Sequence, residues 1–197
     1  HITHFTDAES GDSSWATTGN WSNGVPTADK WVYVGDGTTA NLDTGSGAAL
    51  GLTLGHAAAT ATGGGTLNQL AGDLTVNNDM HIGVIDSSTA TYNMSGGTAT
   101  IGGNVVLGAS GSSGVINLTG GQMNVSGDLT GGIGTSTLNV DGGTLDVGGN
   151  LTVESLRVGY NGRTAQVAVG GDTTLNSTSP LQVGYRDSAT INPSAVT

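Results

Sequence analysis

The chain has 197 residues, contains no cysteine and carries a formal net charge of −11. This charge excludes nucleic acid as a partner because phosphate backbones are repelled, and the lack of cysteine excludes disulfides and thiol catalysis. No apolar run approaches the roughly 20 residues that span a bilayer as a helix, so no membrane insertion is expected.

Residues 1–30 precede the repeats and form a turn-rich lead-in. They hold Trp15 and Trp21, and Trp31 follows at the first expected strand. The open end of a stacked β structure is an unpaired edge that invites association, and natural proteins cover such edges. We therefore predict that these three tryptophans cap the apolar end of the first coil.

The same lead-in holds the residues that suggest a metal ion. They are the carboxylates of Asp7, Glu9 and Asp12 and the imidazoles of His1 and His4. The carboxylates could bind Ca²⁺ incidentally, although the periods of a calcium-binding β-roll and of an EF-hand are both missing. The histidines could chelate copper if His56 or His81 supplied a further ligand. Beyond incidental Ca²⁺, no cofactor is expected.

From residue 31 to residue 191 a unit of roughly 22 to 26 residues recurs. Glycine is unusually frequent, at 36 residues, and lacks the three-residue period of collagen. An apolar residue followed by glycine recurs at Val34-Gly35, Leu54-Gly55, Ile82-Gly83, Leu107-Gly108, Ile133-Gly134, Val158-Gly159 and Val183-Gly184. Gly-Gly turns recur at residues 96–97, 120–121 and 142–143. Between them, short runs alternate apolar residues with Thr, Asn or Ser, which is typical of half-buried strands.

This pattern predicts an all-β fold, a single-stranded parallel β-helix or β-solenoid of about seven three-sided coils with an N-terminal Trp-rich cap. One coil cannot bury its inner face, but stacked coils bury a continuous core. Gly followed by Asp or Asn marks one corner of the coil. We predict a ladder of side-chain hydrogen bonds along that corner, formed by Asp73, Asn104, Asp128, Asn150 and Asp172.

The late coils carry the exposed residues that could bind a ligand. Tyr160 and Tyr185 follow successive apolar-Gly units, so we expect them to stack and to form either a structural aromatic ladder or a glycan or contact patch. Arg163 and Arg186 fall near corners about one coil apart, where solvated positions are expected for both.

Catalysis is not expected. Hydrolysis of a glycoside needs two carboxylates about 5 to 9.5 Å apart across a groove. Neighbours across the coils could come from Asp128, Asp141, Asp146, Glu154 and Asp172, but nothing in the sequence distinguishes a pair.

The C-terminal end lacks an amphipathic helix or an aromatic cover, and we expect residues 192–197 to form a tail after an incomplete last coil. Either the sequence stops short of the natural end of the solenoid, or another chain supplies the next coil. A head-to-tail contact that does not close into a ring generates a filament.

The Trp-rich segment from Trp15 to Asp29 and the coils from about Gly65 to Leu175, of the type GG-T-L-x-V-x-G-N-L-x-V, resemble secreted bacterial β-solenoids such as autotransporter passenger regions and related cell-surface proteins. The resemblance implies an extracellular or cell-surface location after removal of a signal peptide. It carries over no catalytic residue because these regions share a scaffold rather than an active site.

The sequence thus leads to a non-catalytic structural protein that associates with itself head to tail or serves as an adhesive scaffold. The alternative is a carbohydrate-binding or adhesin module of a larger surface protein, with surface glycans as partners. A polysaccharide-degrading enzyme ranks last.

Overall fold

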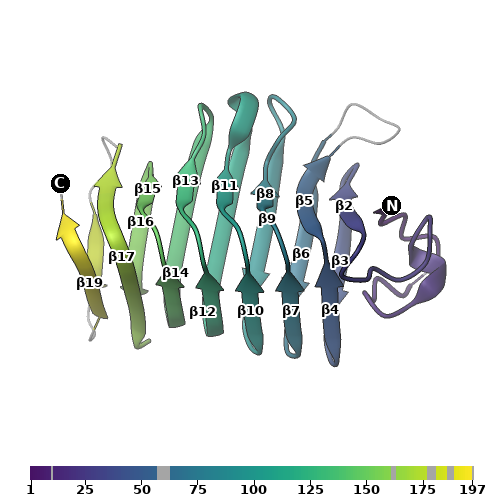
Figure 1. Cartoon of the computed structure of the whole chain (residues 1–197), viewed down its shortest axis with the longest axis horizontal. Helices are drawn as coiled ribbons and strands as arrows, with labels where there is room; N and C mark the ends of the chain where they lie inside the picture. The colour runs from purple at the N-terminus through teal and green to yellow at the C-terminus, as the bar shows by residue number, and fades with distance from the viewer. Residues whose placement is uncertain (10, 57–62, 161–162, 177–180, 186–188, 197) are drawn as a thin grey trace.

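The computed structural model describes residues 1–9, 11–56, 63–160, 163–176, 181–185 and 189–196. The chain forms a parallel β-solenoid of about six turns, which confirms the predicted fold class and is close to the predicted seven coils. Figure 1 shows the coils stacked along the long axis, with the N-terminal lead-in at one end and β19 at the other.

Each coil contributes strands to three parallel sheets, which we call faces A, B and C. Face A contains β1 (Ile2–His4), β2 (Trp31–Gly35), β5 (Gly51–His56), β8 (Met80–Ile82), β11 (Val105–Leu107), β13 (Leu129–Gly131) and β15 (Leu151–Val153). Face B contains β3 (Thr38–Leu42), β6 (Gly65–Gln69), β9 (Thr89–Met94), β16 (Ser155–Tyr160) and β18 (Gln182–Tyr185). Face C contains β4 (Ser46–Ala49), β7 (Asp73–Val76) and β10 (Thr98–Ile101).

Four longer strands bend through a corner and belong to two faces. β12 (Ser113–Val125) and β14 (Thr135–Val147) run from face B into face C. β17 (Ala165–Leu175) and β19 (Ala189–Val196) run from face C into face A. Two short 3-10 turns, η1 (Thr18–Asn20) and η2 (Ala109–Gly111), lie outside the sheets.

The core consists of inward side chains that stack in register from coil to coil. On face A, one such stack contains Val32, Leu52, Met80, Val105, Leu129 and Leu151, all fully buried. On face B the corresponding stack is Ala40, Leu67, Tyr92, Ile116, Leu138 and Leu156. Because apolar residues alternate with polar ones along every strand, stacking the coils buries the apolar set and leaves the polar set outside.

The core also holds one polar pair. Gln69 and Tyr92 are both fully buried, and the Tyr92 hydroxyl donates a hydrogen bond to Gln69 Oε1. The Gln69 amide in turn donates to the carbonyls of Gly72 and Thr98, at 2.9 and 3.0 Å. Both buried side chains are therefore hydrogen-bonded, as buried polar groups must be if they are not to destabilise the fold.

The lead-in closes the first coil by joining two of its sheets. β1 pairs in parallel with β2 on face A. On face B, Trp15 N donates to Asn41 O and Asn41 N donates to Ser13 O, both at 2.7 Å. The lead-in thus satisfies backbone groups at the edges of β2 and β3, as a solenoid cap must.

The structure corrects the predicted phase of the repeat. Ile133 does not end a face A strand; Gly131 occupies that register position opposite Leu107, and Ile133 lies in the following corner. Val158 and Val183 lie on face B and not on face A. The reason is that the corners differ in length, so an equal spacing in sequence leads to different faces.

The predicted domain limits also differ from the observed elements. β19 runs from Ala189 to Val196, so the expected tail at residues 192–197 begins inside a strand. The solenoid sheet likewise begins before residue 31, because β1 already belongs to face A.

Candidate functional site

The corner between faces C and A carries a ladder of hydrogen bonds from side chain to backbone. The side-chain oxygen of each rung accepts from the backbone N–H of the next: Asp79 from Asn104 at 2.7 Å, Asn104 from Asp128 at 2.9 Å, Asp128 from Asn150 at 2.7 Å and Asn150 from Asp172 at 2.9 Å. Asp and Asn alternate, so a neutral amide separates neighbouring carboxylates. The ladder ties the coils together at this corner.

Asp73, predicted as a rung, does not belong to this ladder, and Asp79 takes its place. Asp73 begins β7 at the corner between faces B and C, where its register neighbours are Ser46 and Thr98. Its preceding Gly72 adopts a left-handed φ of 76°, which the tight turn there requires. The dipeptide Gly-Asp therefore serves two different corners.

Glycine precedes the later rungs because the side-chain oxygen of the preceding rung occupies the place where a Cβ would lie. A Cβ at Gly103 would lie 2.3 Å from Asp79 Oδ1, and a Cβ at Gly127 would lie 2.3 Å from Asn104 Oδ1. Asn78, which precedes the first rung, donates its N–H to Leu50 O. Because no ladder side chain reaches Asn78 from the coil before, this position tolerates a side chain, and a search for Gly-Asp or Gly-Asn misses Asp79.

A second ladder runs along the outer surface of face B. The side-chain amide of each asparagine donates to the Oδ1 of the one before: Asn68 to Asn41, Asn93 to Asn68 and Asn117 to Asn93 at 2.9 Å, and Asn139 to Asn117 at 2.8 Å. The sequence signal is an asparagine between two inward residues in each coil.

Arg157 ends the asparagine ladder. It occupies the register position after Asn139, and its guanidinium donates to both Asp141 carboxylate oxygens, at 2.8 and 2.5 Å. The hydrogen bond to Asp141 raises the pKa of Arg157. The guanidinium carbon also lies 4.9 Å from the centre of the Tyr160 ring.

Tyr160 on β16 and Tyr185 on β18 are paired in register. The backbone therefore places the two residues as the predicted stacking requires. The side chain of Tyr185 and all of Arg186 lie outside the described residues. Arg163 donates to the carbonyl of Thr119, at 3.0 Å. The glycan patch predicted from the two tyrosines therefore stays a prediction.

Two of the three tryptophans form the cap. Trp15 and Trp21 are buried, with ring centres 4.9 Å apart, and Trp21 Nε1 donates to Trp15 O at 2.8 Å. The Trp15 ring fills the space left by Gly47, where a Cβ would lie 3.1 Å from the ring. Trp31 instead lies half-buried on the outer surface of face A, against Gly51 of β5.

The predicted metal ligands do not converge. Asp7 accepts a hydrogen bond from Ser13 Oγ, and Asp12 accepts from Thr17 Oγ1 and Ser14 N. The two hydrogen bonds that Asp12 accepts, first from Thr17 and then from Ser14, lower the pKa of Asp12. Throughout the described ranges, no group of three or more His, Asp or Glu side chains is close enough to hold a metal ion. The incidental Ca²⁺ binding inferred from sequence stays a prediction.

His4 and His56 do come together, around Tyr33. The ring centres lie 5.0 Å apart for His4 and Tyr33, 4.3 Å for Tyr33 and His56, and 5.7 Å for the two histidines. Burial, and secondarily the neighbouring His4, lower the pKa of His56. On face A, Thr53 of β5 lies opposite Tyr33, and His81 of β8 lies opposite Thr53. His81 is therefore two strands away from Tyr33 and is not part of this cluster.

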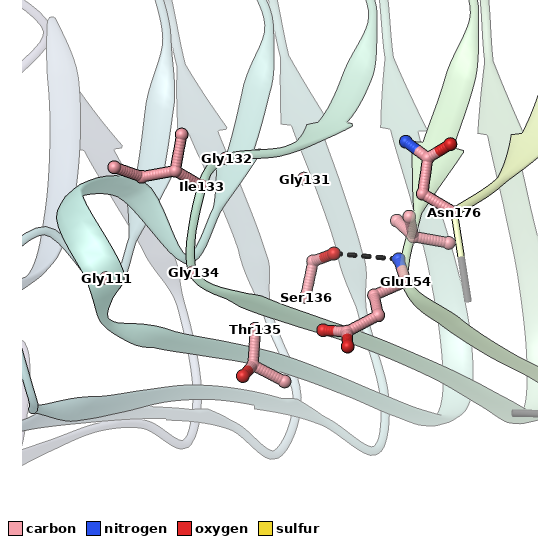
Figure 2. A pocket seen from close by; sticks show the side chains of 10 residues that line it. Gly111, Gly131, Gly132, Ile133, Gly134, Thr135, Ser136, Glu154 and Asn176 are labelled. Carbon is pink, nitrogen blue, oxygen red and sulfur yellow. Dashed lines mark hydrogen bonds between the residues drawn. The ribbon is translucent and has the colours of Figure 1, made fainter. Parts of the chain in front are cut away.

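The described surface contains a groove of about 410 Å³ at the corner between faces A and B, shown in Figure 2. Its lining residues are Gly111, Gly131, Gly132, Ile133, Gly134, Thr135, Ser136, Val153, Glu154 and Asn176. Ile133 is 89% exposed, the most exposed large apolar residue of the described chain. Glu154 N donates to Ser136 Oγ at 2.8 Å, which fixes the groove floor.

The five carboxylates that could have formed a catalytic pair lie in different parts of the solenoid. Asp128 and Asp172 belong to the corner ladder, Asp141 pairs with Arg157, and Glu154 lines the groove. Asp146 lies on face C in register with Asn124.

Comparison with protein families, with curated protein sequences and with solved structures gives no significant match. No helix among the described residues is long and apolar enough to cross a membrane.

Proposed function

We propose that this chain is a non-catalytic structural β-solenoid of an extracellular or cell-surface protein. The observation that carries the proposal is the continuity of its stacking. Inward side chains stack from coil to coil, and two polar ladders hold the coils at the corner and on the outer surface of face B. Such a stack is a stiff rod, because bending it would break hydrogen bonds on every face at once.

The proposal includes end-to-end association. In the described chain, β18 pairs only with β16, and β19 only with β17, so the outer edges of these strands are where another coil would add. At the opposite end, the lead-in covers most of the outer edge of β1: His4 N donates to Ser22 Oγ, Ser22 N donates to His4 O, and Asn23 Nδ2 donates to Ile2 O. A coil that adds at this end would have to displace Ser22 and Asn23, so the open edge for addition is that of β18 and β19. Edge-to-edge addition of a parallel strand uses backbone hydrogen bonds and needs little side-chain specificity.

Electron microscopy of the purified chain over a concentration series, with and without Ca²⁺, tests this proposal. We expect unbranched fibres of solenoid width that lengthen as the protein concentration rises. Discrete short rods at every concentration would contradict end-to-end association. Fibres that form only with Ca²⁺ would instead show that metal ions at the acidic surface drive the contact.

A further inference from the structure

The groove between faces A and B exists because the corners of successive coils differ in length. Residues 108–112 form the corner between β11 and β12, and residues 132–134 form the corner between β13 and β14. Glu154 alone joins β15 to β16. This one-residue corner is recessed beside the longer corner of the preceding coil, residues 132–134, and the recess is the groove shown in Figure 2.

The wall that carries Ile133 is held rigidly by backbone hydrogen bonds. Gly132 N donates to Leu107 O and Gly134 N donates to Gly108 O, both at 2.7 Å. A Cβ at Gly134 would lie 2.0 Å from Ser112 O, so the loop lies directly against the preceding corner. The Ile133 side chain therefore projects into solvent at the rim from a fixed backbone, without a partner in the described chain.

The floor and the far wall are fixed in the same way, and both are polar. The buried Ser136 accepts from Glu154 N, and Figure 2 shows the Glu154 carboxylate directed into the groove on the side of Thr135 and Ser136. Across the groove, Asn176 N donates to Val153 O at 3.0 Å, and its side-chain amide is exposed. Because these groups are already positioned, a ligand would order few side chains on binding.

We propose that this groove binds a neutral saccharide. Sugar rings combine an apolar C–H face, which suits Ile133, with neighbouring hydroxyls, which suit a carboxylate and an amide. Glu154 would accept hydrogen bonds from two hydroxyls, and Asn176 would donate and accept. The volume of about 410 Å³ lies within the range of small-ligand sites.

The charges of the molecule select the class of sugar. No lining residue is cationic, and the chain has a net charge of −11, so uronic acids and sulfated sugars would be repelled. Glu154 is the one carboxylate among the lining residues, which is too few for a Ca²⁺ site built of oxygen ligands. The inference goes beyond the structural role and does not depend on it, because the groove lies on the side of the rod.

Saturation-transfer NMR and calorimetry with glucose, galactose, mannose, N-acetylglucosamine and their β-linked disaccharides test the proposal. We expect at least one of these sugars to bind, and to bind at least about tenfold more weakly to Ile133→Ser and to Glu154→Gln. The matched controls are Leu70→Ser, an exposed apolar residue at another corner, and Asp146→Asn, an exposed carboxylate on face C. Both controls should keep the affinity of the unchanged chain.

Three outcomes would overturn the proposal. They are the absence of binding by every sugar in the panel, binding that survives both groove substitutions, and binding of Ca²⁺ alone at the groove. Circular dichroism and the melting temperature of each variant check that its fold is intact. Fibre formation measured on the same variants should be unchanged, which keeps this test separate from that of the structural role.

Discussion

At the scale of single residues, glycine before a ladder rung is required by the rung of the preceding coil. A Cβ at Gly127 would meet Asn104 Oδ1, the atom that accepts from Asp128 N. The substitution Gly127→Ala should therefore break this hydrogen bond and lower the free energy of unfolding by about 1 to 3 kcal/mol. Urea denaturation measures the change.

Asn78→Ala is the matched control for Gly127→Ala. Asn78 occupies the same corner position two coils earlier, and it already carries a Cβ. Its substitution should change the free energy of unfolding by no more than about 0.5 kcal/mol. An equal loss in both variants would mean that the corner, and not the ladder, is sensitive.

The imidazole of His56 should make stability depend on pH. Burial and the proximity of His4 lower its pKa below the ordinary value of 6.5, while Asp36 opposes the shift. The unfolded chain then binds more protons than the folded chain just below pH 6.5, so stability falls as the pH falls through this window. Melting temperatures measured from neutral to mildly acidic pH should show this loss, and His56→Gln should reduce it.

His81→Gln is the control for His56→Gln, because His81 lies on the same face outside the cluster. It should keep the pH dependence of the unchanged chain. If His56→Gln left that dependence intact, other groups would be responsible for it.

At the scale of elements, the alternation of Asp and Asn along the corner ladder limits charge repulsion. Adjacent rungs lie about 4.8 Å apart, the spacing of β-strands, so consecutive carboxylates are two rungs apart. Asn104→Asp would keep an acceptor for Asp128 N but would place three carboxylates in a row, at positions 79, 104 and 128. Each like-charged neighbour should cost about 1 kcal/mol in water.

Urea denaturation of Asn104→Asp at low and at high salt measures this repulsion. We expect lower stability than that of the unchanged chain at low salt, with part of the loss recovered at high salt through screening. Asp128→Asn, the reverse change, should be neutral or stabilising. Equal stability of Asn104→Asp and the unchanged chain at low salt would show that the charges of the rungs do not interact.

At the scale of the whole molecule, the edge of β18 should control association. Val183 lies on this strand and is 41% exposed. Lysine on an edge strand opposes the addition of another strand, because its charge would be buried in the contact. Val183→Lys should therefore shorten the fibres or abolish them, as measured by sedimentation and electron microscopy. Leu70→Lys, which adds the same charge at a corner, should leave them unchanged.

Much of the fold could be predicted from the sequence, because each coil repeats the same pattern of alternating strands and glycine corners. Alternation of apolar and polar residues gives short strands, and glycine gives the corners, so the all-β solenoid follows from local patterns. The burial of Trp15 and Trp21 follows from their position before the first repeat. These features depend on residues that are close in sequence.

The phase of the repeat and the candidate site depended on contacts between coils. Ile133 matched the repeat by spacing, but unequal corners place it on the rim of a groove. Asp73 matched the ladder motif by its preceding glycine, but Asp79 forms the first rung. The sequence showed that Glu154 is a carboxylate. It did not show that Glu154 lines a groove.

The sequence by itself determined that this chain forms a stack of glycine-cornered β coils with an aromatic cap at its N-terminal end. Only the tertiary structure decided which corner each glycine occupies and which side chains meet across coils. The physical reason is that strand formation depends on neighbours along the chain, whereas ladders and grooves depend on the register of one coil against the next. The strands keep this register although the corners differ in length, so a residue's face cannot be counted from its spacing in the sequence alone.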